Sequence, residues 1–353
     1  METQLKLLEA YHGDCILIKT FDCSGNDFII LIDGGTASTF DYSLKNELKQ
    51  ISKIDLLILT HIDSDHIAGL IRFFKNSLFA KIKVGSFWIN GANLAKTPSG
   101  EKISYNQGKS IEQLLIDNKV ARSSIFSLVT NEFSPSLPEG IEIEILSPTT
   151  SILNSLYAQW PIISKELNAS DVKVKASTGT ASQISKGALV DLAKEEFKPS
   201  KNIENDLFNS SSIAFILRTP DKSILMLGDA RSEVLVNSLN DKGYTKDNKL
   251  LVDFVKVSHH GSINNTSCEL LDIINCDKFG ISTNGGNASH KHPDRETIAR
   301  IVHHPERDYE VERLIFFNYP VDDIQKKCGQ LINSSDLSIG NWSYFDSITE
   351  VPL

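Results

Sequence analysis

The stretch from Leu56 to Gly69 constrains this chain more than any other. A short apolar run stops at Thr60, and four metal-competent side chains follow within six residues: His61, Asp63, Asp65 and His66. Apolar residues then recur at helical spacing, which predicts a buried strand, a polar turn and an amphipathic helix. Imidazole and carboxylate groups are ligands of zinc, iron and manganese. One turn could aim these side chains at two neighbouring metal ions.

Apolar runs that stop at metal-competent residues recur later in the chain. Asp229 follows one such run, the pair His259-His260 follows another, and Asp33 follows a third. Asp33 could orient a metal-bound histidine, or it could serve only the tight Asp-Gly-Gly turn. Asp14, in a Gly-Asp turn, is assigned to turn chemistry. Ligands delivered from several strand ends onto one rim are what a metal site built on a sheet requires.

Hydrophobic patterning predicts a chain of alternating strands and helices. The strands are expected at 5–8, 15–18, 28–32, 56–60, 81–89, 141–146, 211–217, 223–227, 252–257, 278–282 and 313–318. Helices are expected at 42–51, after the polar turn at 61–66, and at 110–118, 231–242, 268–275 and 294–303.

The pattern His-x-Asp-x-Asp-His after an apolar strand resembles the metal motif of the metallo-β-lactamase fold superfamily, whose commoner form is His-x-His-x-Asp-His. The aspartate at its second position, Asp63, resembles the branch with the soluble domain of the competence protein ComEC and the phosphorylcholine esterases. The resemblance implies an α/β (α+β) fold: a four-layer αββα sandwich of two mixed sheets with helices on the outer faces. We expect one domain over 1–353, a loop insertion at about 164–209 and a C-terminal extension packed on the domain at about 320–353.

The resemblance also implies roles for individual residues. The metal ligands that it implies are His61 and Asp63 for a first ion, Asp65, His66 and His260 for a second, and Asp229 between the two. The sequence leaves open which of His259 and His260 binds metal; we favour His260, with His259 near the substrate or acting as a proton donor. His292, in a His-Pro pair similar to the family's last motif, could protonate a leaving group or bind phosphate. His290 is as consistent with a surface loop as with function, and the remaining histidines, His12, His303 and His304, are assigned to structure or surface.

One histidine of the commoner pattern is missing, because none lies between His66 and His259. The competence-type branch has Asn-x-x-Ser before a strand, and the stretch that begins at Asn209 resembles it. The first site is therefore expected to be rich in oxygen, with Asp63 and Asn209 as candidate donors. We expect two divalent ions, with zinc as the first choice and manganese or magnesium as competitors at the first site.

Composition narrows the class of protein. The 353 residues carry a net charge of −9, which argues against a broad basic surface for nucleic acid but does not exclude a nuclease whose metals supply local positive charge. The five cysteines are odd in number and lack C-x-x-C spacing, and no secretory leader or apolar run long enough to cross a bilayer is present. The sequence therefore predicts a cytoplasmic protein with reduced thiols and no membrane partner.

The chemistry that these residues permit is metal-assisted hydrolysis, in which a metal-bridging hydroxide attacks the substrate. Asp65 and Asp229 would position the hydroxide, and His259 or His292 would act as the acid. Our leading hypothesis is a phosphodiesterase or nuclease, with single-stranded nucleic acid as a candidate substrate. The alternatives are a hydrolase of a small ester, lactone, lactam or thioester, and an inactive metal-binding module that acts through protein partners the sequence does not identify.

Overall fold

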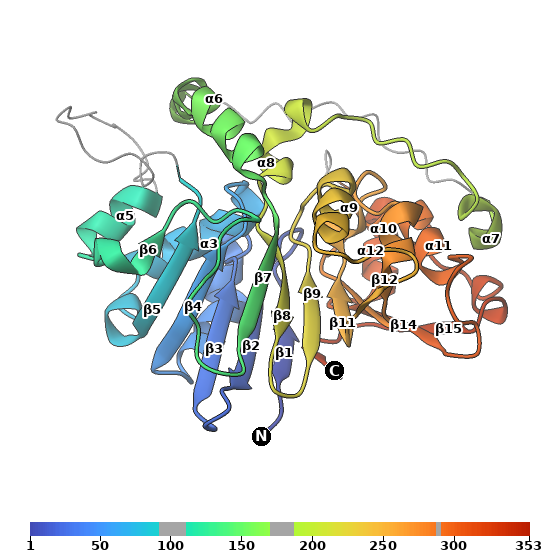
Figure 1. Cartoon of the computed structure of the whole chain (residues 1–353), viewed down its shortest axis with the longest axis horizontal. Coiled ribbons are helices and arrows are strands. Elements are labelled where there is room, and N and C mark those ends of the chain that lie inside the picture. The colour runs from blue at the N-terminus through green and yellow to red at the C-terminus, as the bar shows by residue number, and fades with distance from the viewer. Residues whose placement is uncertain (92–110, 170–186, 287–290) are drawn as a thin grey trace.

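Two β-sheets packed face to face form the centre of the molecule, and helices cover their outer faces (Figure 1). The computed structural model describes residues 1–91, 111–169, 187–286 and 291–353. The order of layers is helix, sheet, sheet, helix, so the predicted fold class is confirmed.

The first sheet combines the N-terminal half of the chain with its last strand. Its order is β16-β1-β2-β3-β4-β5-β6. The pairs from β16 to β3 are antiparallel, and those from β3 to β6 are parallel. In this order the strands are Glu350–Val351, Gln4–Leu7, Ile16–Phe21, Asp27–Ile32, Lys53–Leu59, Lys83–Ile89 and Ile125–Phe126.

The second sheet has the order β15-β14-β13-β11-β9-β8-β7. Its pairs from β15 to β9 are parallel, and β9, β8 and β7 form an antiparallel meander. In this order the strands are Trp342–Phe345, Arg313–Phe317, Lys278–Ile281, Phe254–Lys256, Ser223–Met226, Ala214–Arg218 and Glu142–Ser147. Beside it, β10 (Leu250–Leu251) and β12 (Ile274–Asn275) form a short parallel ribbon.

Helices flank both sheets and also lie across one end of the molecule (Figure 1). Those that follow strands of the first sheet are α1 (Ala37–Thr39), a π-helical turn (Phe40–Leu44), α2 (Lys45–Leu48), α3 (Ser64–Lys75) and α5 (Ile111–Asp117), with 3₁₀ turns at Phe79–Lys81 and Arg122–Ser124. Those that follow strands of the second sheet are α9 (Ser232–Asp241), α10 (Cys268–Ile273), α11 (Arg295–Val302) and α12 (Val321–Cys328), with 3₁₀ turns at Ser258–Gly261 and Asp336–Ser338. Between β7 and β8 lie α6 (Thr150–Ala169), α7 (Leu189–Leu192), a 3₁₀ turn (Glu204–Asp206) and α8 (Leu207–Ser210).

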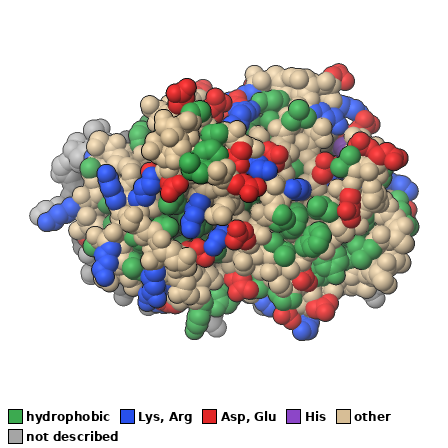
Figure 2. Space-filling view, turned by 90° about the horizontal axis from the view of Figure 1, so that it is seen from below, with side chains coloured by type: hydrophobic (Ala, Val, Ile, Leu, Met, Phe, Trp, Pro, Cys, Tyr) green, Lys and Arg blue, Asp and Glu red, His purple; other side chains and the backbone are tan. Residues whose placement is uncertain are grey.

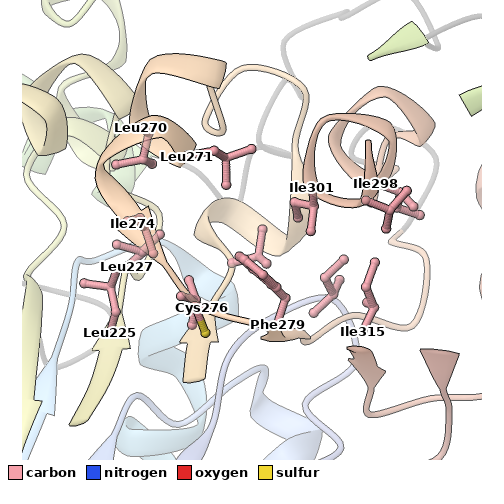
Figure 3. Packing of buried hydrophobic residues seen from close by; sticks show 14 of the residues in the cluster. Leu225, Leu227, Leu270, Leu271, Ile274, Cys276, Phe279, Ile298, Ile301 and Ile315 are labelled. Carbon is pink, nitrogen blue, oxygen red and sulfur yellow. The ribbon is translucent and has the colours of Figure 1, made fainter. Parts of the chain in front are cut away.

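The core has three main layers, and the alternation of side chains along β4 shows how they are divided. Leu56 and Ile58 pack between the two sheets, whereas Leu57 and Leu59 pack against the helices outside the first sheet. A strand buried on both faces must be apolar throughout, which explains the uninterrupted run in the sequence. The equivalent layer outside the second sheet, between its strands and α10 and α11, is shown in Figure 3.

Several elements were not anticipated from the sequence. The helix expected at 42–51 spans 37–48 as three consecutive helical segments, and neither α6 nor α12 was predicted. α6 runs into the start of the predicted insertion, of which 170–186 lie outside the described residues. Within 320–353, β15 adds to the second sheet and β16 to the first, so this segment contributes an edge strand to each sheet.

The surface seen in Figure 2 carries basic and acidic side chains intermixed, with apolar side chains between them. Of the helices in the described part of the chain, none has the length and apolar character needed to cross a bilayer. All five cysteines are free thiols.

Candidate metal centre

The predicted metal ligands come together where β4, β9 and β11 end. Four imidazoles surround a single atom, Oδ2 of the buried Asp229 side chain. Their Nε2 atoms lie 3.8 Å (His61), 3.4 Å (His66), 3.8 Å (His259) and 3.6 Å (His260) from that oxygen. Two atoms that bind one tetrahedral ion at about 2.1 Å are about 3.4 Å apart, so these separations are those of ligands around shared ions.

Asp33 orients two of these rings. Its Oδ2 accepts hydrogen bonds from the Thr60 hydroxyl (2.7 Å) and from His66 Nδ1 (2.8 Å). Because the Thr60 proton is given to Asp33, the Thr60 oxygen is left to accept from His61 Nδ1 at 3.1 Å. Both rings therefore carry hydrogen on Nδ1 and turn Nε2, the atom that would bind a metal, toward Asp229. Of the two roles considered for Asp33, the structure supports the orienting one.

Backbone and amide acceptors orient the other two rings. His260 Nδ1 donates to the Ser282 carbonyl at 2.9 Å, and His259 Nδ1 contacts Asn265 Oδ1 at 3.1 Å. The Asn265 amide nitrogen donates to the Asp229 and Ala230 carbonyls, so its oxygen is the acceptor for His259. All four imidazoles thus turn Nε2 toward the same carboxylate.

The turn that carries His259 and His260 has an unusual backbone. Both residues are in the left-handed region, with φ of 48° and 54°, and Gly261 follows with φ of 85°. A left-handed non-glycine residue costs about 1–2 kcal/mol, so two in succession persist only where the surroundings hold them. The holding contacts run to the turn before α9: His259 N donates to the Gly228 carbonyl (2.9 Å), and the Ser258 hydroxyl donates to the Ala230 carbonyl (2.7 Å).

Burial and the charges of neighbouring groups shift the pKa values of the side chains in this cluster. Burial opposes ionisation of Asp229, but His66, His260 and His259 hold its pKa well below the usual range. Burial opposes protonation of His66, yet Asp229 and Asp33 raise its pKa well above that of ordinary imidazole, and Asp229 and Asp14 raise the pKa of His260 against the same burial effect. Burial lowers the pKa of His259 to about 3, so this ring is neutral at pH 7.

The residues present fit a metal centre. Within the described residues, the Nε2 atoms of His61, His66 and His260 and Oδ1 of Asp229 are buried without a hydrogen-bond partner. Buried polar atoms are rarely left unpaired, and a cation would satisfy all four. Among the described residues, four sets of donors lie within 4.8 Å of one another, and two of them consist of predicted ligands alone: His61, His66 and Asp229, and Asp65, His66 and His260.

The two adjacent histidines, His259 and His260, have different neighbours. His260 Nε2 lies 3.7 Å from Asp65 Oδ2, in the predicted second ligand set, whereas His259 stacks edge-on against His292 with ring centroids 5.1 Å apart. His292 Nδ1 contacts Asp294 at 3.2 Å, and its side chain is 18% exposed. These positions favour His260 as the ligand and place His259 and His292 side by side.

The first ligand set is more open. Asp63 precedes α3 at the N-cap position but makes no capping bond; its carboxylate lies 3.6 Å from His61 Nε2 and is 43% exposed. Asn209 is buried, with its Oδ1 unpaired within the described part of the chain and its amide nitrogen bonded to Asp206. Ser212, the serine of the same motif, accepts a hydrogen bond from Asp229 N at 3.0 Å. This motif therefore holds the backbone of Asp229, the residue that carries the central carboxylate.

The other histidines fall outside the cluster or outside the described residues. His304 bonds the Cys268 carbonyl and contacts Asp272, and His303 is buried near α11 and Gly340. His290 lies outside the described residues.

The assignment of Asp14 to turn chemistry is wrong. Its side chain is fully buried, forms an ion pair with the buried Lys256 and lies 3.5 Å from His260 Nδ1. Burial opposes its ionisation, but Lys256 and His260 lower its pKa. The sequence analysis also missed Lys256, Thr60 and Asn265. A lysine inside the apolar run of β11 was the one signal that could have been noticed, since buried lysines need a partner.

Comparison with known proteins finds a family model that matches part of the chain. Residues 8–120, which include the His61-to-His66 motif, match the model of the metallo-beta-lactamase superfamily. The matched segment makes up less than half of the chain and holds the first four predicted metal ligands.

Individual relatives are distant. The metallo-beta-lactamase fold protein YhfI from Bacillus subtilis is 10% identical, with all of both chains covered and a TM-score of 0.40. A long form RNase Z from yeast is 12% identical, with 99% of this chain and 41% of that chain covered and a TM-score of 0.40. Zn²⁺-bound PqqB from Methylobacterium extorquens is 9% identical, with 96% and 87% covered and a TM-score of 0.38. No curated protein matches, and similarity at this level carries no conclusion about substrate.

Proposed function

We propose that this protein is a metal-dependent phosphodiesterase, with single-stranded nucleic acid as a candidate substrate. The observation that carries the proposal is the pair of adjoining donor sets at Asp229. One set contains Asp229 itself with His61 and His66, and the other, Asp65, His66 and His260, shares His66 and brings His260 Nε2 to 3.6 Å from Asp229 Oδ2. Paired divalent ions about 3.5–4 Å apart suit in-line displacement at phosphorus, because they stabilise the attacking and the leaving oxygen together.

The residues of the site divide into holders and proton donors. When bound, the ions would supply an activated water and neutralise developing negative charge. Asp65, His66 and His260 would hold one ion, His61 and Asp63 the other, and Asp229 both. Asp65 and Asp229 also orient the attacking water.

His292 is the better placed acid of the two candidates. As the phosphorus–oxygen bond to the leaving group breaks, that oxygen takes a proton from His292, and the oxygen of water becomes part of the phosphate product. His259, neutral at pH 7, offers Nε2 as an acceptor and has no proton there to give. The Asp294 carboxylate against His292 Nδ1 orients that ring.

The oxygen-rich first ligand set and the resemblance of Asp63 to the competence-type and phosphorylcholine-esterase branch support a phosphodiester over a lactam. Aspartate in place of a second histidine favours harder ions, and such ions commonly serve phosphate chemistry. The small-ester hydrolase and the inactive binding module remain the competing hypotheses and are the other outcomes of the test.

The test adds Zn²⁺, Mn²⁺ or Mg²⁺ separately to metal-stripped protein and follows cleavage of single-stranded DNA and of bis(p-nitrophenyl) phosphate. Asp65→Ala and Asp229→Ala should abolish cleavage, and Asp191→Ala, at an exposed aspartate on α7, is the matched control. Metal-loaded, folded protein that cleaves only carboxylic esters or lactams would establish the second hypothesis. Metal binding without turnover on any ester would establish the third.

A further inference from the structure

Lys256 is a charged residue at the centre of the molecule. It lies on β11 between two parallel neighbours, and its side chain is fully buried. Its ammonium group forms an ion pair with Asp14 and lies 3.4 Å from the Gly228 carbonyl. An unpaired buried ammonium is strongly unfavourable, so Lys256 depends on Asp14.

Asp14 comes from the other sheet, in the loop between β1 and β2, and its two oxygens differ. Oδ2 is held by Lys256. Oδ1 is buried, has no hydrogen-bond partner within the described part of the chain and lies 3.5 Å from His260 Nδ1. The proton on that nitrogen is already given to the Ser282 carbonyl. Asp14 therefore stands behind the His260 ring without replacing its hydrogen-bond acceptor.

Asp14 is itself able to bind a metal. Its carboxylate belongs to two sets of mutually close donors, one with Asp33 and His66 and one with Asp229 and His260. A free carboxylate at this position would compete with the ligands around Asp229 or draw the His260 proton away from Ser282. The ion pair with Lys256 removes that competition by neutralising Asp14.

Lys256 and Gly13, the residue before Asp14, contact the backbone or side chains of the other ligand-bearing segments. A Cβ on Gly13 would lie 1.7 Å from the Asp65 carbonyl oxygen, so the loop that carries Asp14 packs directly on the turn after β4. The Ser282 hydroxyl donates to the Gly13 carbonyl at 3.1 Å, and Lys256 reaches the residue before Asp229. The pair thus lies where the loops of Asp65, Asp229 and His260 meet.

We propose that the Lys256–Asp14 ion pair is a positioning device for the second metal site, which keeps Asp14 out of the ligand set and holds His260, Asp65 and Asp229 in register. The proposal rests on the metal centre and not on the substrate class proposed above. Its test is metal binding in the absence of substrate, so either proposal can fail without the other.

A second buried ion pair provides the matched control. Arg295 and Asp336 form two contacts of 2.8 Å, and both side chains are almost fully buried. Arg295 also donates to the carbonyls of Gly187, just before α7, and of Leu331, in the C-terminal segment, and neither residue belongs to the ligand set. Disrupting either pair should lower the melting temperature, but only disruption of the Lys256–Asp14 pair should change metal affinity.

The experiment measures Zn²⁺ and Mn²⁺ binding by isothermal titration calorimetry for Asp14→Asn, Lys256→Met, the double variant and the control Asp336→Asn, with circular dichroism to verify folding. We expect the three site variants to bind one of the two ions about 10–100-fold more weakly, as for loss of other groups that orient ligands. The control should melt at a lower temperature with both affinities unchanged.

Wild-type affinity at both sites in folded Asp14→Asn and in the folded double variant would overturn the proposal. Equal weakening in the control would also overturn it, since the effect would then be a general loss of stability. If Lys256→Met alone fails to fold, the near-isosteric Asp14→Asn and the double variant decide. Failure of all three while the control folds would make the pair a folding requirement and would likewise overturn the proposal.

Discussion

The turn after β4 and the turn after β11 deliver imidazoles to the same carboxylate oxygen by different means. After β4, Asp63 has extended dihedrals (φ −64°, ψ 148°) and α3 starts normally at Ser64, so His61 and His66 are placed by ordinary strand and helix geometry. After β11, two successive histidines adopt left-handed dihedrals before Gly261.

The difference lies in what holds each turn. The β4 turn is supported by side chains, since Asp33 bonds His66 directly and His61 through Thr60. The β11 turn is supported chiefly by contacts with the turn before α9, which carries Asp229. The first turn also receives a backbone hydrogen bond from Ile213, just before β8, at 2.9 Å, but its histidines are oriented by Asp33 and Thr60. We therefore expect change in the turn before α9 to affect the second turn and the central carboxylate together.

Removal of the shared carboxylate should have the largest effect. Asp229→Ala is expected to abolish binding of both ions and to lower any hydrolytic rate by about 10³-fold or more, because the Nε2 atoms of all four imidazoles lie within 3.8 Å of its Oδ2. Metal content measured by plasma mass spectrometry after dialysis, against the exposed-site control Asp191→Ala, checks this. Retention of two ions would show that Asp229 does not join the two sites.

Comparison of Gly261, in the β11 turn, with Gly243, after α9, distinguishes the cost of backbone strain from the cost of steric crowding. Gly261 and Gly243 have similar φ values, 85° and 87°, but a Cβ on Gly261 would lie 2.6 Å from Pro293 Cβ, whereas a Cβ on Gly243 would meet nothing within 4 Å. Both alanine variants should lose about 1–2 kcal/mol of unfolding free energy through the left-handed dihedral, and Gly261→Ala about 1–3 kcal/mol more through overpacking.

Chemical denaturation measures both variants, and metal titration of the folded proteins completes the comparison. Gly261→Ala should also weaken the ion that His260 holds, while Gly243→Ala should leave both ions unaffected. Equal stabilities of the two variants would show that Pro293 yields to the added methyl group and that the turn is not tightly held.

The support of the β4 turn is tested by Asp33→Asn. The amide cannot accept all three hydrogen bonds that Asp33 receives from Thr60 and His66, so one imidazole should lose its orientation. We expect a 10–100-fold loss of metal affinity, as is typical for groups behind metal-bound histidines. The control is Asp55→Asn. Asp55 lies on β4, and its carboxylate accepts a hydrogen bond from Ile29 N, away from the ligands, so this variant should bind both ions normally. If Asp33→Asn bound metal with unchanged affinity, Thr60 and α3 alone would be enough to orient His61 and His66.

The turn after β4 was easier to predict from the sequence than the turn after β11. The β4 motif was recognisable because regular strand and helix geometry converts sequence spacing into position. The roles expected for Asp229 and His260 came from the family resemblance, together with their places after apolar strands. Left-handed dihedrals carry no such spacing, so the sequence left open which of His259 and His260 binds metal. Asp14 and Lys256 lie about 240 residues apart in the chain on different sheets, and only the packing of the two sheets brings them together.

The smallest expected effect is on the pH dependence of thermal stability in the metal-free protein, where histidine nitrogens that would bind metal can be protonated instead. In the metal-free protein, Asp229 and Asp33 raise the pKa of His66 against the effect of burial, and Asp229 and Asp14 raise that of His260. A histidine with a raised pKa in the folded state contributes stability that is complete below its unfolded pKa of about 6.5 and is lost as pH rises through the folded value. Thermal stability of the metal-free protein should therefore fall between pH 6.5 and 8, by up to about 1.4 kcal/mol per pH unit for each proton released.

The stabilisation provided by a bound metal has the opposite pH dependence. An ion must displace the same protons, so it binds more tightly as pH rises and the histidines lose them. The difference in melting temperature between metal-loaded and metal-free protein should thus widen as pH rises from 6.5 to 8. Differential scanning calorimetry at constant ionic strength measures it, and His66→Ala should flatten the pH dependence of the metal-free protein. A gap that stays constant across this range would mean that the imidazoles are already unprotonated before the metal arrives, and that the cluster around Asp229 is prepared for ions without proton competition.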